Sequence, residues 1–399
     1  MPQELLWLLL PVAAASGWIA ARRSASQSVP LKTSAIPRDY YKGINYFLSE
    51  QPDKAIDVFI GILEIDSETV EPHLALGNLF RRRGEVDRAI RIHQNLIARP
   101  SLTKSQRDQA LLELGHDYFQ AGLLDRAETL LHELTERDQR NLVAFKLLKN
   151  IYEQENEWHR AILAMRKIEI ITGTRKRNII AQYYCELAAI EIDAGEYQQA
   201  QKFLRKAQTS DGSCARAYIV QAELHRIKGH YKAAIKSYKR AVQILPECLA
   251  EIVEALVECF TQAGKEKEMM SYLGVAVLHQ KLIAPVLFYT QRLSALHDDQ
   301  TAMQFLSTYL NRYPSMSGLS ELLNLSDRHR SQPVADTEFS IRPIIDKLIK
   351  EISVYYCNNC GFSGNTWHWQ CPGCRQWETQ LPHVVTAANG KHMMDHHEK

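Results

Sequence analysis

The sequence lacks a net charge large enough to define a partner. Its 399 residues contain 48 lysines and arginines against 46 aspartates and glutamates, a formal net charge of +2. A nucleic-acid-binding domain normally carries a clear excess of basic residues, so we expect no nucleic-acid partner. Apolar residues make up 45% and charged residues 24% of the chain, both near globular averages, so it is expected to fold.

The chain also lacks the cysteine pattern of a disulfide framework. Four of its eight cysteines lie singly within stretches of helical periodicity. Unpaired helical cysteines and metal-binding thiols both fit a reducing compartment better than an oxidising one. We therefore expect the bulk of the chain to be cytoplasmic. The single cysteines are Cys185, Cys214, Cys248 and Cys259.

Motifs of common enzyme classes are missing as well. The sequence contains no GxSxG, no GxGxxG and no Walker loop. The string that comes nearest to a zinc-protease motif, at residues 132–136, lacks the second histidine. We therefore predict that the protein is not an enzyme.

One long apolar run is present near the N-terminus. Residues 5–21 contain no charged side chain, which is the lower limit for a helix that spans about 30 Å of hydrocarbon. Trp7 and Trp18 lie near its two ends, where interfacial aromatics are common. Arg22 and Arg23 follow at once, so the positive-inside rule places the rest of the chain in the cytoplasm.

We predict a transmembrane anchor at residues 1–22 and a flexible juxtamembrane linker at residues 23–35. The alternative is a cleaved signal peptide, which the alanine-rich end of the run favours. The absence of a basic segment before the run and the two arginines directly after it argue against cleavage.

The middle of the chain repeats itself. Small or flexible residues recur at spacings of 34, 38, 34, 39, 34, 35 and 33 residues. Glycines recur where each pair of predicted helices would turn, and aromatic or leucine side chains recur at fixed offsets. The spaced residues are Ala55, Ala89, Ala127, Ala161, Ala200, Ala234, Met269 and Ala302; the turn glycines are Gly84, Gly122, Gly195, Gly229 and Gly264; the offset residues include Phe59, Leu131, Leu204 and Tyr238.

This pattern resembles the tetratricopeptide repeat. Small residues let two helices approach closely, and glycine permits the turn between them. The resemblance predicts an all-α superhelix of about eight helical hairpins over residues 36–316. The two longest spacings place extra residues near 100–105 and 172–178, where we expect longer turns between hairpins.

Stacked hairpins of this kind form an extended groove that binds other proteins. In the repeat family the ligand-facing side chains come from the first helix of each hairpin. The alternative for each such position is an ordinary solvated helix surface, and a general peptide-binding chaperone remains a second functional hypothesis. The candidate groove residues are Asn78, Arg81, His116, Phe119 and Arg226.

After the repeats we expect a connector and a docking helix at residues 317–353. Isoleucines and a leucine between residues 341 and 352 fall on one helical face, which should pack onto the last hairpin. The last segment, residues 382–399, is expected to be a flexible tail.

Four cysteines near the C-terminus form the most specific chemical motif. Cys357 and Cys360 make one CxxC pair, and Cys371 and Cys374 make a second pair after a ten-residue gap. Two such pairs can surround one ion with four thiolates in a tetrahedron. Iron and zinc both accept this ligand set, so the residues leave the metal open between them.

The two knuckles, CxxCG and CPxC, resemble rubredoxin and predict a small rubredoxin-like domain at residues 354–381. The short gap departs from true rubredoxins and favours a structural ion, with electron transfer as the alternative. Trp367, Trp369 and Trp377, with Tyr355 and Tyr356, are expected to form a minimal apolar core around the ion, and a binding surface is the alternative. So small a module is expected to depend on its metal to fold.

The order of anchor, repeats and metal module resembles the lipopolysaccharide assembly protein B family of Gram-negative bacteria. The stretches YCNNCGF at 356–362 and WQCPGCR at 369–375 carry this likeness. It implies a single-pass inner-membrane adaptor that couples the protease FtsH to degradation of the deacetylase LpxC. Other lipopolysaccharide synthesis or transport proteins are further implied partners, and the oligomeric state, including a homodimer, is left open.

Overall fold

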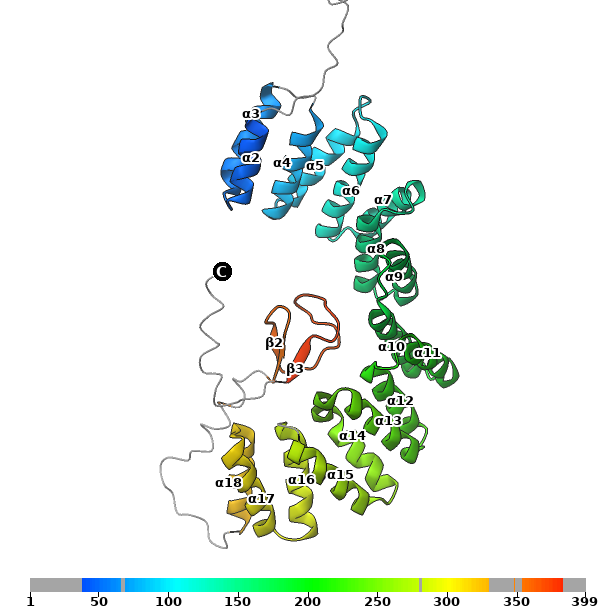
Figure 1. Ribbon diagram of the computed structural model, residues 1–399, viewed down its shortest axis with the longest axis vertical. Coiled ribbons are helices and arrows are strands. Elements are labelled where there is room, and N and C mark those ends of the chain that lie inside the picture. The colour runs from blue at the N-terminus through cyan, green and yellow to red at the C-terminus, as the bar shows by residue number, and fades with distance from the viewer. Residues whose placement is uncertain (1–37, 66–68, 280–281, 330–347, 349–353, 383–399) are drawn as a thin grey trace, which may run out of the picture. The chain divides into compact units, whose positions relative to one another are not determined.

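The computed structural model describes residues 38–65, 69–279, 282–329, 348 and 354–382 (Figure 1). Within them it contains seventeen α-helices, one short 3-10 helix and three strands. The chain divides into two compact units, the first ending at Ile151 and the second beginning at Tyr152. The predicted all-α repeat fold with a small four-cysteine module is confirmed.

The first unit consists of helices that pair in chain order. Their bounds are α2 Arg38–Leu48, α3 Pro52–Ile65, α4 Val70–Arg82, α5 Val86–Ile97, α6 Lys104–Gln120 and α7 Leu124–Arg137. Contacts are richest between α2 and α3, α4 and α5, and α6 and α7, which identifies each pair as one hairpin. The next helix, α8 (Leu142–Gln154), contains the boundary between the units.

The second unit continues with more hairpins and ends in a small sheet. Its helices are α9 Trp158–Thr172, α10 Arg177–Asp193, α11 Tyr197–Ser210, α12 Ala215–Ile227, α13 Tyr231–Ile244, α14 Leu249–Gln262, α15 Glu266–His279, α16 Ile283–Leu296, α17 Asp299–Arg312 and α18 Met316–His329, with the 3-10 helix η1 at Pro246–Cys248. The strands β1 Tyr355–Cys357, β2 Ser363–Gly364 and β3 Gln380–Pro382 form an antiparallel sheet in the order β2-β1-β3.

The turn glycines predicted from the repeat adopt left-handed backbone conformations. Gly84, Gly122, Gly195, Gly229 and Gly264 all have φ between 65° and 81°. A side chain is disfavoured in this conformation, which explains why glycine recurs there. The α8–α9 turn uses an asparagine, Asn156, with φ 58°, the other residue type that tolerates it.

The small residues that define the repeat lie where the two helices of a hairpin meet. None of the eight has any exposed surface, and the four offset residues Phe59, Leu131, Leu204 and Tyr238 are equally buried. An alanine methyl group lets the helix axes come close, and the larger side chains fill the space on either side. The buried small residues are Ala55, Ala89, Ala127, Ala161, Ala200, Ala234, Met269 and Ala302.

The extra residues in the two longest repeats form helix. α6 and α10 each contain 17 residues, whereas α4, α8 and α12 each contain 13. The α9–α10 connection is no longer than the α11–α12 connection, so the expectation of a longer turn there was wrong. At the start of α6, Thr103 and Gln106 form a reciprocal capping box, which begins the helix one turn early.

Several predicted segments lie outside the described residues. These are the anchor at 1–22, the linker at 23–35, most of the docking helix within 317–353 and nearly all of the tail at 382–399. Residues 317–329 of the expected connector lie in α18, which packs against α17. Across the part of the chain that is described, no helix is both long and apolar enough to cross a membrane.

A buried polar cluster joins three helices of the first unit. His93 of α5 is fully buried, and its Nδ1 lies 2.5 Å from Oδ2 of Asp117 on α6, which is also fully buried. The other oxygen of Asp117 accepts a hydrogen bond from Arg81 of α4 at 2.8 Å. The opposite edge of the imidazole faces Gly77, where a Cβ atom would lie 2.3 Å from Nε2.

We predict that Gly77→Ala destabilises the first unit by about 2 kcal/mol, because the imidazole is held by Asp117 and cannot withdraw from the added methyl group. Gly61→Ala is the matched control, since a Cβ atom at this helical glycine meets nothing within 4 Å. It should be neutral or stabilising by up to about 1 kcal/mol. Urea unfolding of both variants measures the difference, and equal midpoints would contradict the prediction.

Candidate metal centre

The two CxxC pairs fold into matching turns. In the first, the Cys357 amide donates to the Phe362 carbonyl and the Gly361 amide donates back to the Cys357 carbonyl. The second repeats this arrangement, because the Cys371 amide donates to Gln376 and the Arg375 amide donates to Cys371. Each pair of cysteines is therefore presented by the same local backbone geometry.

These turns bring four sulfur atoms together. Cys357 Sγ lies 3.7 Å from Cys374 Sγ, and Cys360 Sγ lies 3.7 Å from Cys371 Sγ. All four sulfurs lie within 4.8 Å of one another. A tetrahedral ion with metal–sulfur bonds of about 2.3 Å requires sulfur–sulfur distances of about 3.8 Å. The four residues thus fit one tetrahedral metal ion.

Hydrogen-bond donors around the sulfurs favour the thiolate form. The amide of Asn359 donates to Cys357 Sγ at 3.4 Å, and the Thr379 hydroxyl lies 3.3 Å from the same sulfur. Burial raises the pKa of Cys357, but the hydrogen bonds with the Thr379 side chain and with the Cys360 and Asn359 amides outweigh it and lower the pKa to about 6. Burial raises the pKa of Cys371 to about 12.

The fifth residue of each turn takes a left-handed conformation. Gly361 has φ 76°, and Arg375, at the equivalent place in the second turn, has φ 55°. A side chain is disfavoured there, so the arginine carries a conformational cost that the glycine does not. Arg375 also donates a hydrogen bond to the Gln154 side chain of α8 at 3.2 Å. That contact links the second turn to the helical array.

Trp377 is the main contact between the metal module and the helices. Its ring meets Trp158 and Tyr183 edge-on, at centroid distances of 6.1 and 5.8 Å. Its indole nitrogen donates to Glu153 Oε1 at 3.1 Å, and the Tyr183 hydroxyl donates to the same oxygen at 2.5 Å. Burial, with the neighbouring carboxylate, raises the pKa of Tyr183, so this hydroxyl remains a donor.

Arg216 of α12 extends the same contact. Its guanidinium lies 5.7 Å from the Trp369 ring centroid and 5.9 Å from that of Trp377, and it is paired with Glu186 at 2.8 Å. Beside it, the Gln182 amide donates to the Glu378 carboxylate at 2.7 Å. Burial raises the pKa of Glu378, although this hydrogen bond opposes the shift. The module is therefore held by helices α8, α9, α10 and α12.

The expectation that all three tryptophans form the core of the module was wrong for Trp377. Trp367 does pack within the module, on Tyr355 and Trp369. Sequence analysis also missed Glu153, Tyr183 and Arg216, whose roles depend on segments about 30 to 224 positions apart. A buried glutamate on an inner helix face is a signal that single-sequence periodicity does not reveal.

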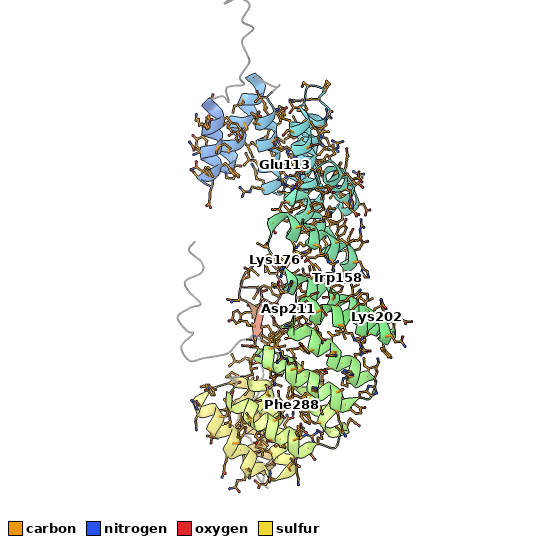
Figure 2. The ribbon with its side chains drawn as sticks, turned by 45° about the vertical axis from the view of Figure 1, so that its right-hand side comes forward. Glu113, Trp158, Lys176, Lys202, Asp211 and Phe288 are labelled. Atoms are coloured by element: carbon orange, nitrogen blue, oxygen red, sulfur yellow. The ribbon has the colours of Figure 1, made fainter. Side chains whose placement is uncertain are left out.

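Four of the predicted groove residues lie in the first unit, on α4 and α6. Arg81 donates to Asn78 at 2.7 Å and forms ion pairs with Glu113 (Figure 2) and Asp117 at 2.7 and 2.8 Å. Burial and the nearby arginine lower the pKa of His116. Phe119 is half-buried on the same helix. The structure thus brings Asn78 and Arg81 together, with the arginine already engaged.

Arg226 lies in the second unit on α12 and shows the same arrangement. It pairs with Glu223 on its own helix at 2.8 Å and with Glu258 on α14 at 3.0 Å. Arg81 and Arg226 each pair with a glutamate on the first helix of the following hairpin. Both glutamates, Glu113 and Glu258, lie 32 positions further along the chain than their arginine. These arginines link successive hairpins, and their role in partner binding stays a prediction.

Metal removal should unfold the module, since so few residues cannot bury enough apolar surface without the ion. We expect Cys371→Ser to abolish stoichiometric metal binding and the near-ultraviolet circular dichroism of the module. Cys248→Ser is the matched control, because both cysteines are 1% exposed and Cys248 lies outside the two turns. The measurement is the metal content of each variant. Full metal content in Cys371→Ser would contradict the assignment of Cys371 as a ligand.

Trp377→Ala should detach the module from the helices without loss of its metal ion. The truncation removes two ring contacts and the donor to Glu153, which we expect to weaken docking by about 3 kcal/mol. Hydrogen exchange should increase in α10 near Tyr183 while the metal content stays unchanged. Trp367→Ala is the contrast, since it should loosen the module itself. Unaltered exchange in α10 would show that Trp377 does not hold the interface.

Comparisons with known proteins agree with this geometry. Residues 355–380 match the rubredoxin metal binding domain, and residues 73–107 and 185–247 match tetratricopeptide repeats. Lipopolysaccharide assembly protein B of Escherichia coli (strain K12) is 37% identical over 383 residues, covering 95% of this chain and 98% of that protein. The protein of the same name from Haemophilus influenzae is 32% identical over 392 residues, with the same coverage.

Solved structures add only a distant likeness. The C-terminal part of a TPR repeat-containing protein from Cytophaga hutchinsonii is 14% identical and covers 70% of this chain and 99% of that one, with a TM-score of 0.40. The assignment therefore rests on the sequence relatives, which match nearly the whole chain, and on the four assembled cysteines. The chain belongs to the lipopolysaccharide assembly protein B family.

Proposed function

We propose that this protein is an inner-membrane adaptor that brings the deacetylase LpxC to the protease FtsH and so limits lipopolysaccharide synthesis. Membership of the lipopolysaccharide assembly protein B family supports a role in lipopolysaccharide assembly. The choice of FtsH and LpxC as partners rests on the family resemblance. Other lipopolysaccharide synthesis and transport proteins are further candidates for the same array.

The observation that carries the adaptor role is the docking of the metal module on the helices. Trp377 of the module contacts Glu153 and Arg216 of the helices, so side chains of both parts meet in one contact. Binding surfaces assembled on rigid, preorganised elements lose less entropy when a partner binds. A repeat array with a fixed second module is therefore suited to holding two proteins in one orientation.

We further propose that the metal ion is structural. Both zinc and iron satisfy four thiolates at the observed spacing, so the sulfur geometry supports either. A rubredoxin-like redox role is the second candidate, because residues 355–380 match that domain. Reversible reduction and oxidation of the iron-loaded protein, without loss of docking, would favour the redox role.

The proposed anchor at residues 1–22 supplies the membrane location. Its uncharged run and following arginines support a single pass with the remaining chain in the cytoplasm. Deletion of residues 1–21 should abolish regulation, because the adaptor would no longer be concentrated near a membrane protease. A fully active truncated protein would contradict this part of the proposal.

The adaptor role predicts that loss of the metal module stabilises LpxC in cells. We expect the Cys371→Ser, Cys374→Ser double variant to lengthen the LpxC half-life severalfold and to recover less FtsH or LpxC in crosslinked pull-downs from membranes. Cys248→Ser, which leaves the four ligands intact, should behave as wild type. Failure of wild-type protein to recover FtsH and LpxC, with unchanged LpxC turnover in the variant, would refute the proposal.

A further inference from the structure

Basic residues are concentrated on three successive second helices, although the whole chain is nearly neutral. α11 carries three lysines and arginines and α13 carries four, and neither contains an aspartate or glutamate. α9 adds Arg160, Arg166 and Lys167 against a single carboxylate, Glu169. That carboxylate accepts a hydrogen bond from the Lys176 amide at 2.5 Å. Other second helices, such as α5 and α7, mix both signs.

These cations are exposed on the side of the helices away from the metal module. The module contacts α8, α10 and α12 and meets α9 at Trp158, its first residue, whereas α11 and α13 lie on the far side of the array from the strands (Figure 1). Lys202 projects from this outer side (Figure 2). We call this surface the outer basic face; its exposed cations are Arg166, Lys167, Lys202, Arg205, Lys206, Lys232, Lys236 and Arg240.

Side-chain contacts make the outer basic face continuous. Arg166 of α9 donates to the Tyr184 hydroxyl at 3.1 Å, and Lys206 of α11 lies 5.8 Å from the centroid of the same ring. Further along, Gln208 of α11 donates to Gln221 of α12 at 2.9 Å. Gln221 in turn lines a hollow beside α13. One band of positive charge therefore runs across three hairpins.

The hollow beside α13 has a volume of about 700 Å³, and its lining includes five lysines and arginines against one carboxylate. Its one carboxylate, Glu268, is engaged by Lys239 at 2.7 Å and Lys265 at 2.6 Å. Hydrogen bonds from these two lysines lower the pKa of Glu268 to about 2, so it stays ionised and paired. The remaining cations of the hollow are Lys232, Lys236 and Arg240, which can meet an anionic group.

Exposed aliphatic side chains lie among the cations of α9. Leu163 is 62% exposed and Ile170 is 77% exposed, and they share one helical stripe with Arg166 and Lys167. Aliphatic and basic residues interleaved on one exposed helix face are typical of helices that lie at the surface of a membrane. Nucleic-acid surfaces instead use exposed aromatic rings for stacking.

We propose that the outer basic face rests on the anionic phospholipid surface of the membrane. The cations would meet lipid phosphates, and Leu163 and Ile170 would enter the boundary between headgroups and acyl chains. Such a contact turns the opposite side of these hairpins, with the metal module, away from the bilayer. The proposal depends neither on FtsH or LpxC as partners nor on the predicted anchor.

Lysine footprinting of the full-length protein tests this contact without mutation. The protein is placed in vesicles of phosphatidylcholine, either alone or mixed with about one third phosphatidylglycerol. A water-soluble reagent that reacts with lysine amines is then added. We expect anionic vesicles to slow labelling of Lys167, Lys202 and Lys232 by about fivefold or more, and high salt to restore it. The exposed Lys176, which lies just before α10 and on the opposite side of the array from Lys202 (Figure 2), should label equally in both vesicles.

Two variants separate the charged from the apolar part of the contact. Charge reversal by K202E, R205E and K206E should return the labelling of Lys167 and Lys232 to its rate in neutral vesicles. K176E changes an exposed lysine on the opposite side of the array and should leave protection intact. L163N with I170N should reduce protection about twofold or more at unchanged charge. Metal content and far-ultraviolet circular dichroism confirm that each variant is folded.

Three outcomes would overturn the proposal. The first is equal labelling of the outer basic face in neutral and anionic vesicles. The second is equal slowing of Lys176, which would indicate general adsorption. The third is protection of the face in native membranes but not in anionic vesicles that contain no other protein, which would assign the face to an acidic protein.

Discussion

Close approach of the two helices in each hairpin is the constraint on which the other features depend. Ala127 and its equivalents have no exposed surface, and a larger side chain there would push the helices apart. The second helix packs closely on the first, so each hairpin places its first helix on one side of the stack and its second helix on the other side. Stacked hairpins then present two distinct rows of helices, and each row can evolve its own surface chemistry.

In the second unit, the row of first helices is specialised to hold the metal module. Glu153 is only 5% exposed, and a buried carboxylate is costly unless its oxygens are hydrogen-bonded. Tyr183 and Trp377 both donate to it, one from the helices and one from the module. Removing the module would leave this carboxylate without the Trp377 donor. Docking therefore stabilises both parts, and the ion that folds the module indirectly stabilises the helices.

The parts of the fold that depend on local chemistry were predictable from the sequence. Gly84 and the other turn glycines follow from the left-handed backbone, and the cysteine spacing fixes a turn that needs few residues. Contacts between distant segments were not predictable in this way. Trp377 could have packed inside the module or outside it, and only the position of Glu153, 224 residues earlier, decides the matter. The extra residues expected to lengthen the turn before α10 instead lengthen that helix, which is a choice that the repeat spacing alone does not reveal.

A net charge of +2 hides how the charges are distributed. In the second unit, the carboxylates of the first helices engage arginines of neighbouring hairpins, as Glu186 engages Arg216 and Glu258 engages Arg226. Among the second helices, α11 and α13 have no acidic side chain, whereas α15 carries Glu266 and Glu268. Attraction to an anionic surface depends on the charges within about 10 Å of it, so the local excess matters more than the total. A nearly neutral protein can thus present one strongly basic side while keeping its module-binding side balanced.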